Sequence, residues 1–166
     1  MKLVRENINF ERTDNPLRNM SIGRRTQIEK WLEEMEVKNY TINEDLTIDV
    51  KESVDLRNEN LSSFPPFIKF RNVGGGFYCD RNQLTSLEGC PQSVGGNFFC
   101  NSNQLTSLEG CPQSVGGNFY CNGNRLTSLE GGPQSVGGDF CCSGNKKKFS
   151  EEEVRKFCDV KENIQV

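Results

Sequence analysis

The chain has 166 residues, with 20 basic and 23 acidic side chains, which fits one domain with appendages. It contains no histidine, which excludes Ser-His and Cys-His catalysis and histidine-ligated zinc. The sequence has no apolar run of membrane-spanning length and no hydrophobic signal core, so we expect neither insertion nor secretion. The eight cysteines are then expected to be reduced, as in a cytoplasm, and not to form a disulfide framework.

The chain opens with a polar segment, residues 1–20, that we expect to be an extended arm. A helix is predicted from about Ile22 to Glu36, with Ser21 as its N-cap. This helix would cover the first turn of a repeat stack with the apolar residues on one of its faces, namely Ile28, Trp31, Leu32 and Met35. The segments Leu46–Val50 and Val54–Leu56 alternate like strands and predict a hairpin-like start to the stack.

Internal repetition dominates the next part of the sequence. Three units spaced by 21 residues are nearly identical: Leu84–Gln104, Leu105–Arg125 and Leu126–Lys146. A weaker copy, Leu61–Gln83, precedes them and has two extra residues in its loop. Repeats of this length predict a solenoid, in which each turn buries its apolar side chains against its neighbours.

Each unit contains a short alternating segment, such as Phe98-Phe99-Cys100, between a Gly-Gly pair and an asparagine. Alternation predicts one strand per turn, and stacked strands lie about 4.8 Å apart, so equivalent side chains form columns. The columns expected in the core are Phe77, Phe98, Phe119 and Phe140; Cys79, Cys100, Cys121 and Cys142; Leu84, Leu105 and Leu126; and Leu87, Leu108 and Leu129. Asn82, Asn103, Asn124 and Asn145 form a further column, which we expect to bond to the backbone of adjacent turns. The Gly-Gly pair permits a positive φ or a close backbone approach.

At the C-terminal end Lys147 replaces a core leucine, so the stack is expected to stop there. Ser150 and Glu153 form a capping box that predicts a second helix. The predicted organisation is an arm (1–20), a helix and cap (21–45), a solenoid (46–145), and a capping helix with a tail (146–166). The fold class is α+β: a leucine-rich-repeat-like solenoid of about four to five turns of short parallel strands between two capping helices.

The repeat resembles bacterial leucine-rich repeats, with Leu-x-x-Leu, a proline turn, and a strand followed by Asn-x-Leu, over roughly Val54 to Asn145. It departs from them by using Phe and Cys where leucine is usual. The pattern LTSLEGCPxxVGGNFxCxxN is similar to repeat proteins carried by tailed bacteriophages. That resemblance implies a phage-encoded protein in the host bacterial cytoplasm or, alternatively, in the virion.

Several features have the composition of chemical sites and are interpreted as structural. The cysteine columns could approach one another as a soft-metal site, but small apolar packing is the favoured interpretation. Cys141 differs, because alternation places it on the outer side as an exposed thiol. The Gly-Asp loop does not have the nine-residue period of calcium-binding β-helices. Neither a metal, nor a cofactor, nor a catalytic residue is expected.

The concave strand face is the candidate binding site. Its central column is Tyr78, Phe99, Tyr120 and Cys141, and the flanking columns include Asp80, Asn101, Asn122 and Arg81. Outward aromatics are typical of interface hot spots, although they also suit strands and cover one another. In the three strong copies the differences concentrate in and beside this strand, whereas exposed turn residues are unchanged.

The sequence therefore predicts non-enzymatic protein–protein recognition. The phage resemblance implies that the partner is a host protein, such as a defence component, which the chain binds and inhibits. The alternative is a virion structural or decoration protein that docks on a neighbouring subunit. The partner expected is a protein. Nucleic acid is not expected, because residues 61–145 are sparse in Lys and Arg, and neither a membrane nor a small-molecule substrate is expected.

Overall fold

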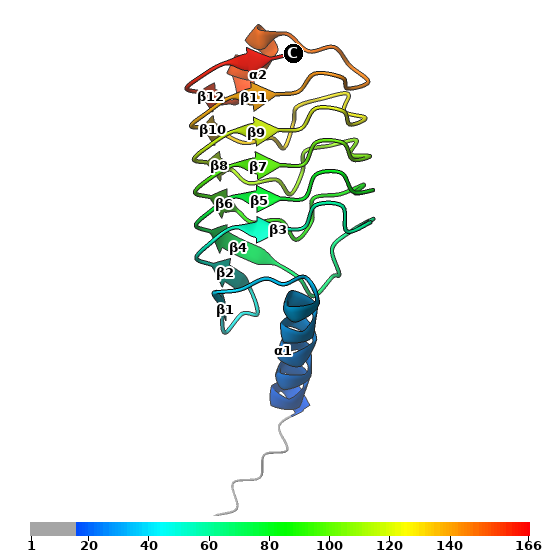
Figure 1. Cartoon of the computed structure of the whole chain (residues 1–166), viewed down its shortest axis with the longest axis vertical. Helices are drawn as coiled ribbons and strands as arrows, with labels where there is room; N and C mark the ends of the chain where they lie inside the picture. Colours follow the sequence, from blue (N-terminus) through cyan, green and yellow to red (C-terminus); the bar gives the residue numbers. More distant parts are fainter. Residues whose placement is uncertain (1–15) are drawn as a thin grey trace, which may run out of the picture.

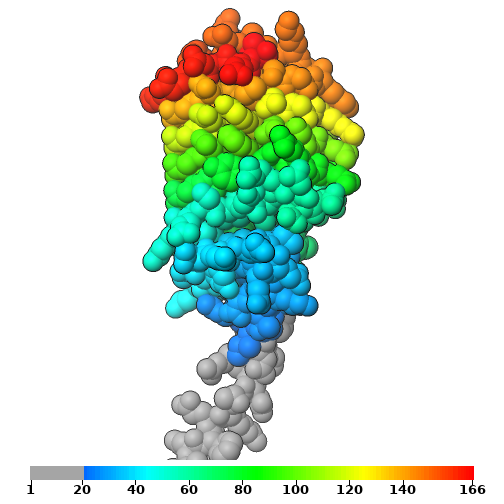
Figure 2. All heavy atoms as spheres, viewed as in Figure 1, coloured from blue at the N-terminus to red at the C-terminus, as the bar shows by residue number. Residues whose placement is uncertain are grey.

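The computed structural model describes the backbone of residues 16–166 and the side chains of residues 21–166, so the predicted arm falls outside the described side chains. The chain forms a solenoid whose turns stack along one long axis (Figures 1 and 2). Two sheets run the length of the stack. The six-stranded sheet contains β3 (Val54–Asp55), β5 (Phe77–Tyr78), β7 (Phe98–Phe99), β9 (Phe119–Tyr120), β11 (Phe140–Cys141) and β13 (Ile164–Gln165). The seven-stranded sheet contains β1 (Tyr40–Ile42), β2 (Ile48–Val50), β4 (Phe70–Val73), β6 (Ser93–Val94), β8 (Ser114–Val115), β10 (Ser135–Val136) and β12 (Asp159–Val160).

The repeat solenoid is confirmed, and each turn contains one more strand than the sequence analysis expected. Strand pairing is parallel and in register at the 21-residue period, with Phe98 opposite Phe119 and Ser93 opposite Ser114. The Ser-Val strand before each Gly-Gly pair has only two residues, which is too short for an alternation pattern to reveal. The six-stranded sheet has one strand in each turn, so the solenoid has six turns, one or two more than expected.

The N-terminal end differs from the expected hairpin. Helix α1 spans Pro16–Glu34, so it begins earlier than predicted and buries the expected residues Ile28 and Leu32 completely. Strand β2 pairs antiparallel with β1, whereas β3 belongs to the other sheet. The prediction that Leu46–Val50 pairs with Val54–Leu56 is therefore wrong. The three residues between β2 and β3 turn the chain from one sheet to the other, as the Gly-Gly corner does in later turns.

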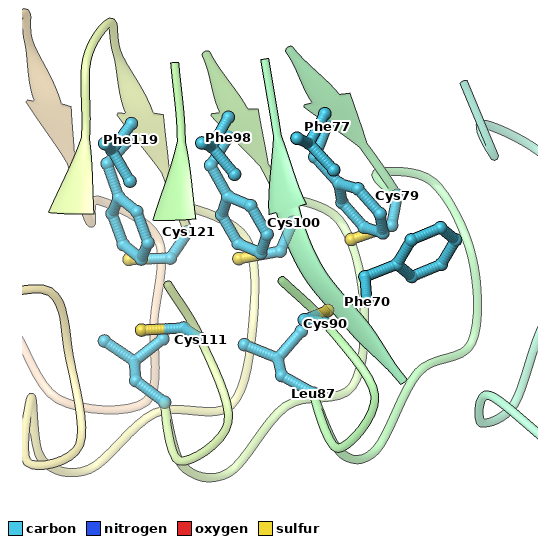
Figure 3. Packing of buried hydrophobic residues seen from close by; sticks show 14 of the residues in the cluster. Phe70, Phe77, Cys79, Leu87, Cys90, Phe98, Cys100, Cys111, Phe119 and Cys121 are labelled. Atoms are coloured by element: carbon cyan, nitrogen blue, oxygen red, sulfur yellow. The ribbon is translucent and has the colours of Figure 1, made fainter. Parts of the chain in front are cut away.

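The core between the two sheets holds the predicted columns. Phe77, Phe98 and Phe119 are fully buried, and their rings stack along the axis with centroids 5.8 and 5.6 Å apart and nearly parallel planes (Figure 3). The predicted cysteine and leucine columns are buried beside them. At the first turn Trp31 of α1 meets Phe64 and Phe70 edge-on, so the helix closes this end of the phenylalanine column.

The asparagine column forms the expected hydrogen-bond ladder. Asn103 donates from Nδ2 to the carbonyl oxygens of Cys79 and Cys100, at 3.0 and 3.1 Å. Its Oδ1 accepts the backbone N–H of Leu84 at 2.9 Å. Asn82, Asn124 and Asn145 repeat the pattern. Each amide therefore joins two successive turns, and the polar group is buried without losing its partners.

The first glycine of each Gly-Gly pair is required because the backbones of successive turns approach closely at this corner. A Cβ on Gly95 would overlap the carbonyl oxygen of Gly74, and one on Gly116 would overlap that of Gly95. These corner glycines do not have a positive φ. Backbone stacks directly on backbone at this corner, which leaves no room for a side chain between turns.

The C-terminal end corrects the prediction that the stack stops at Lys147. Helix α2 (Glu151–Phe157) has the predicted capping box, with Ser150 and Glu153 bonded reciprocally, and buries Val154. The chain then adds β12, parallel to β10, and β13, parallel to β11. Helix α2 therefore lies within the sixth turn, where it replaces the Leu-x-x-Leu segment of the other turns.

Candidate functional site

The predicted site lies on the outward side of the six-stranded sheet, here called the outer face. Tyr78, Phe99 and Tyr120 stand on the successive strands β5, β7 and β9 and are half-buried. They are paired in register, Tyr78 with Phe99 and Phe99 with Tyr120. The structure therefore brings together the three aromatic residues that the sequence placed in one column, while the phenylalanine before each of Tyr78, Phe99 and Tyr120 points into the core.

The three rings cover one another along the stack. Phe99 and Tyr120 are stacked with centroids 4.6 Å apart and planes 6° apart, whereas Tyr78 meets Phe99 edge-on at 5.3 Å. Tyr120 is held by Asn118, whose Nδ2 donates to the phenolic oxygen at 3.3 Å. A Cβ on Gly76 would overlap the Tyr78 hydroxyl, so this ring lies back over that glycine. Stacking therefore covers one face of each ring in the Phe99–Tyr120 pair, while Tyr78 contacts Phe99 through a ring edge.

Cys141 does not fit the expected exposed position. It is only 6% exposed, and its Sγ lies 3.5 Å from Ser143 Oγ. All eight cysteines are free and buried. Burial raises the pKa of the Cys100 and Cys121 thiols well above the usual value, and that of Cys142 to about 12. Burial therefore favours the neutral thiol, which packs as a small apolar side chain, over the thiolate that nucleophilic attack and metal binding require.

The flanking columns differ in backbone conformation. Arg81 and Ser102 have left-handed backbones, with φ of +56° and +55°, and so do Gly123 and Gly144 at the equivalent positions of later turns. The chain turns a corner of the solenoid at this position with a left-handed backbone. Glycine adopts that conformation without steric cost, which explains why Gly123 and Gly144 occur there. The inner flanking column of Asp80, Asn101 and Asn122 lies between this reversal and the aromatic ladder.

The two ends of the outer face carry different chemistry. The end near α1 is charged. There, Arg57 donates to Asp55 through Nε at 2.8 Å and Nη2 at 2.5 Å, and its guanidinium lies 5.3 Å from the centroid of the Tyr78 ring. This pairing lowers the pKa of Asp55. Burial has the opposite effect on Asp80 and raises its pKa. The later turns place neutral Asn and Ser at the Asp80 position.

A second polar ladder lies beside the aromatics, and the sequence analysis did not predict it. Asn97 Oδ1 accepts the backbone N–H of Asn118, Asn118 Oδ1 accepts that of Asp139, and Asp139 Oδ1 accepts that of Asn163, each at 2.9 Å. The signal is present in the sequence, because Asn or Asp follows the Gly-Gly pair in all three strong copies. This ladder fixes the start of each strand and, through Asn118, the Tyr120 ring.

Among residues 21–166, no group of three or more Cys, Asp or Glu side chains is placed to hold a metal ion. In the described part of the chain neither helix combines the length and apolar character needed to cross a bilayer. Comparison with known proteins finds no matching family, no matching curated protein and no matching solved structure.

Proposed function

We propose that this chain is a non-enzymatic protein-recognition module that binds a partner protein through the outer face of its six-stranded sheet. The observation that carries the proposal is the aromatic ladder of Tyr78, Phe99 and Tyr120, which is half-buried and points away from the core. Aromatic side chains dominate the energetics of protein interfaces, and rings that already pack against one another have less side-chain entropy to lose when a partner covers them.

The surroundings of the ladder support a protein partner. Asn101 and Asn122 flank the aromatics with neutral amides that can both donate and accept, which suits the polar rim of an interface. The chain has a net charge of −3, which does not attract a phosphate backbone. Diversity is concentrated here, since the ladder positions change between copies while the exposed residues of the Leu-x-x-Leu turns do not.

The sequence resemblance to phage repeat proteins supports a more specific proposal. We propose that the solenoid is a variant of the leucine-rich-repeat-like proteins of tailed phages, with a second strand in each turn. The partner is then a bacterial host protein, such as a defence component, whose activity the complex inhibits. A virion role would place the same face against a neighbouring subunit, and mass spectrometry of purified particles separates the two.

The test compares two triple variants. The first replaces Tyr78, Phe99 and Tyr120 with alanine, and the matched control replaces Thr85, Thr106 and Thr127, which recur at the same period and are exposed on the turns. Partners captured with the wild-type protein from a bacterial lysate are identified and purified, and their affinities for all three proteins are measured by calorimetry. The aromatic variant should lose several kcal/mol of binding free energy, at about 2 kcal/mol for each hot-spot residue. Equal affinities for both variants would exclude the outer face.

A further inference from the structure

The seven-stranded sheet has its two end strands covered by arginines. A strand at the end of a sheet presents backbone N–H and C=O groups that no neighbouring strand bonds. Arg25 of α1 donates to the carbonyl oxygen of Ile42 in β1 at 3.0 Å. Arg155 of α2 donates to the carbonyl oxygen of Val160 in β12 at 3.4 Å. At each end of this sheet a helix therefore satisfies an outward carbonyl group of the last strand.

Strand β3, the end strand of the six-stranded sheet beside α1, has no such cover. The N–H groups of Val54 and Leu56 donate to the carbonyl oxygens of Gly76 and Tyr78, at 2.9 and 2.7 Å. Successive residues of a strand direct their backbone groups to opposite sides, so the N–H and C=O of Asp55 face away from β5. Within residues 21–166, neither a further strand nor a side chain bonds these two groups. The edge of β3 is therefore free.

A cleft of about 520 Å³ opens beside this edge, a size within the range of about 300–1,000 Å³ that is usual for binding sites. Ser53 and Asp55 contribute to its lining, together with residues 34–37 at the end of α1. Helix α1 continues beyond β3 along the long axis of the stack (Figure 1), so a second solenoid cannot stack end to end on this edge. The cleft therefore suits a single extended segment.

The charge of the lining indicates what kind of segment fits. Besides Asp55, which is paired with Arg57, the cleft is lined by three glutamates and one further arginine, namely Glu34, Glu36, Glu59 and Arg81. The lining thus has four carboxylates against two guanidinium groups. Opposite charges across an interface favour association and select between partners. The cleft therefore favours a segment with basic side chains.

We propose that a basic, extended segment of the partner protein adds a strand to the free edge of β3. The backbone of the segment accepts the Asp55 N–H and donates to the Asp55 carbonyl oxygen. Main-chain bonds of this kind supply affinity, and the alternate side chains of the added strand supply specificity. The added strand extends the six-stranded sheet, so its outward side chains continue the outer face beyond Tyr78. This inference rests on the proposed function and names how the partner is recognised.

The test uses a short peptide, which probes the edge of β3 without the rest of an interface. Acetylated and amidated Thr-Lys-Val-Lys-Val-Thr combines strand-forming and basic residues, and it is titrated into the full-length protein while backbone amides are followed by NMR. The amide proton of Asp55 should move downfield and exchange more slowly with solvent, because it gains an acceptor. The same peptide with every central amide N-methylated cannot donate and should leave the Asp55 signal in place. A version with Glu in place of Lys should bind more weakly.

Asp55→Pro is the decisive variant, and Asp55→Thr is its matched control. Both remove the carboxylate that pairs with Arg57, but only proline also removes the outward N–H, and an edge strand tolerates proline where that N–H faces away from the sheet. We expect Asp55→Pro to bind the lysine peptide about fivefold more weakly than Asp55→Thr, the equivalent of one backbone hydrogen bond. Unchanged amide signals in β9 and β11 check that both variants are folded.

Three results would overturn strand addition: equal binding of the peptide by the two variants, equal binding of the N-methylated and unmodified peptides by the wild-type protein, or a shift of the Asp55 amide with protein concentration alone. The last result would assign the edge to a second copy of the chain. Each leaves the proposed function to its own test, because the alanine variant of the aromatic ladder is measured against the whole partner.

Discussion

Phe119 and Tyr120 are neighbours on one strand and belong to two different regions of the molecule. Phe119 lies fully buried in a column of phenylalanines that repeats without change from Phe77 to Phe140. Tyr120 lies half-buried in an outer column that reads Tyr, Phe, Tyr and Cys. Both columns stack at the spacing of the strands, so stacking alone does not explain why one is uniform and the other is not.

The difference shows what the solenoid constrains. A core side chain meets the turns above and below and the opposite sheet, so a change of size in one turn leaves a cavity or a clash. The half-buried outer aromatics meet their neighbours in the column, a few polar side chains beside them and solvent, so a change of size there meets fewer packed atoms than in the core. The outer face is therefore where this fold can vary its recognition chemistry at low cost in stability.

The largest expected effect concerns the thiols, since all eight are buried, including Cys141 of the outer column. Because reactivity requires exposure and a thiolate, labelling of the native protein by a maleimide reagent should be at least about 1,000-fold slower than labelling in denaturant. Quantitative mass spectrometry over time measures both rates. Rapid modification of Cys100 or Cys121 would contradict the buried cysteine column. Rapid modification of Cys141 alone would mean that this thiol on the outer face is accessible to solvent.

The next effect compares the two faces of one strand directly. Phe119→Ala should lower the free energy of unfolding by about 3–5 kcal/mol, because it leaves a ring-sized cavity between two stacked phenylalanines. Tyr120→Ala should cost about 1 kcal/mol, the loss of one stacked aromatic pair at a half-buried site. Urea unfolding measures both. Equal losses of unfolding free energy would mean that Tyr120 is packed as tightly as the core residue Phe119.

The polar ladders provide an intermediate case. Asn103→Ala should cost about 1–3 kcal/mol, because it leaves the Leu84 N–H without its acceptor and removes the donor to two carbonyls. Asn101→Ala, two residues earlier and on the outer face, should change stability by less than about 0.5 kcal/mol. Thermal melts of the two variants at one concentration check the ranking, and similar melting temperatures would contradict the buried ladder.

The sequence predicted the parts of the fold that a repeat makes visible. Equivalent residues recur 21 positions apart, so the columns of Phe98, Cys100 and Asn103 follow from the spacing alone. The second strand of each turn does not, because Ser93 and Val94 are only two residues beside a corner, too few to show the alternation that indicates a strand. The sixth turn was not predicted for a related reason: α2 replaces the leucine segment, and Asp159–Val160 does not resemble the repeat closely enough to be recognised.

The candidate site was predicted in part, for the same reason. Alternation placed Tyr78, Phe99 and Tyr120 together, because strand geometry alone determines that relation. Cys141 was misplaced, since alternation gives the direction of a side chain but not whether its neighbours cover it. Asp80 was named only as a flanking residue. Its burial and its missing hydrogen-bond partner depend on the three-dimensional packing of the first turns, which no local pattern contains.

The smallest expected effect concerns Asp80, where removing a charge should raise the free energy of unfolding at neutral pH. Burial raises the folded-state pKa of Asp80, so its charged form destabilises the fold above the unfolded-state pKa, and stability is lost as pH rises through the folded-state value. Asp80→Asn should therefore stabilise the protein at pH 7 by about 1 kcal/mol, the low end of the cost of an unpaired buried polar group.

The gain should disappear near pH 3, where Asp80 is neutral in both states, and urea unfolding at the two pH values tests this. A structural acid would show the opposite result, with Asp80→Asn destabilising at pH 7.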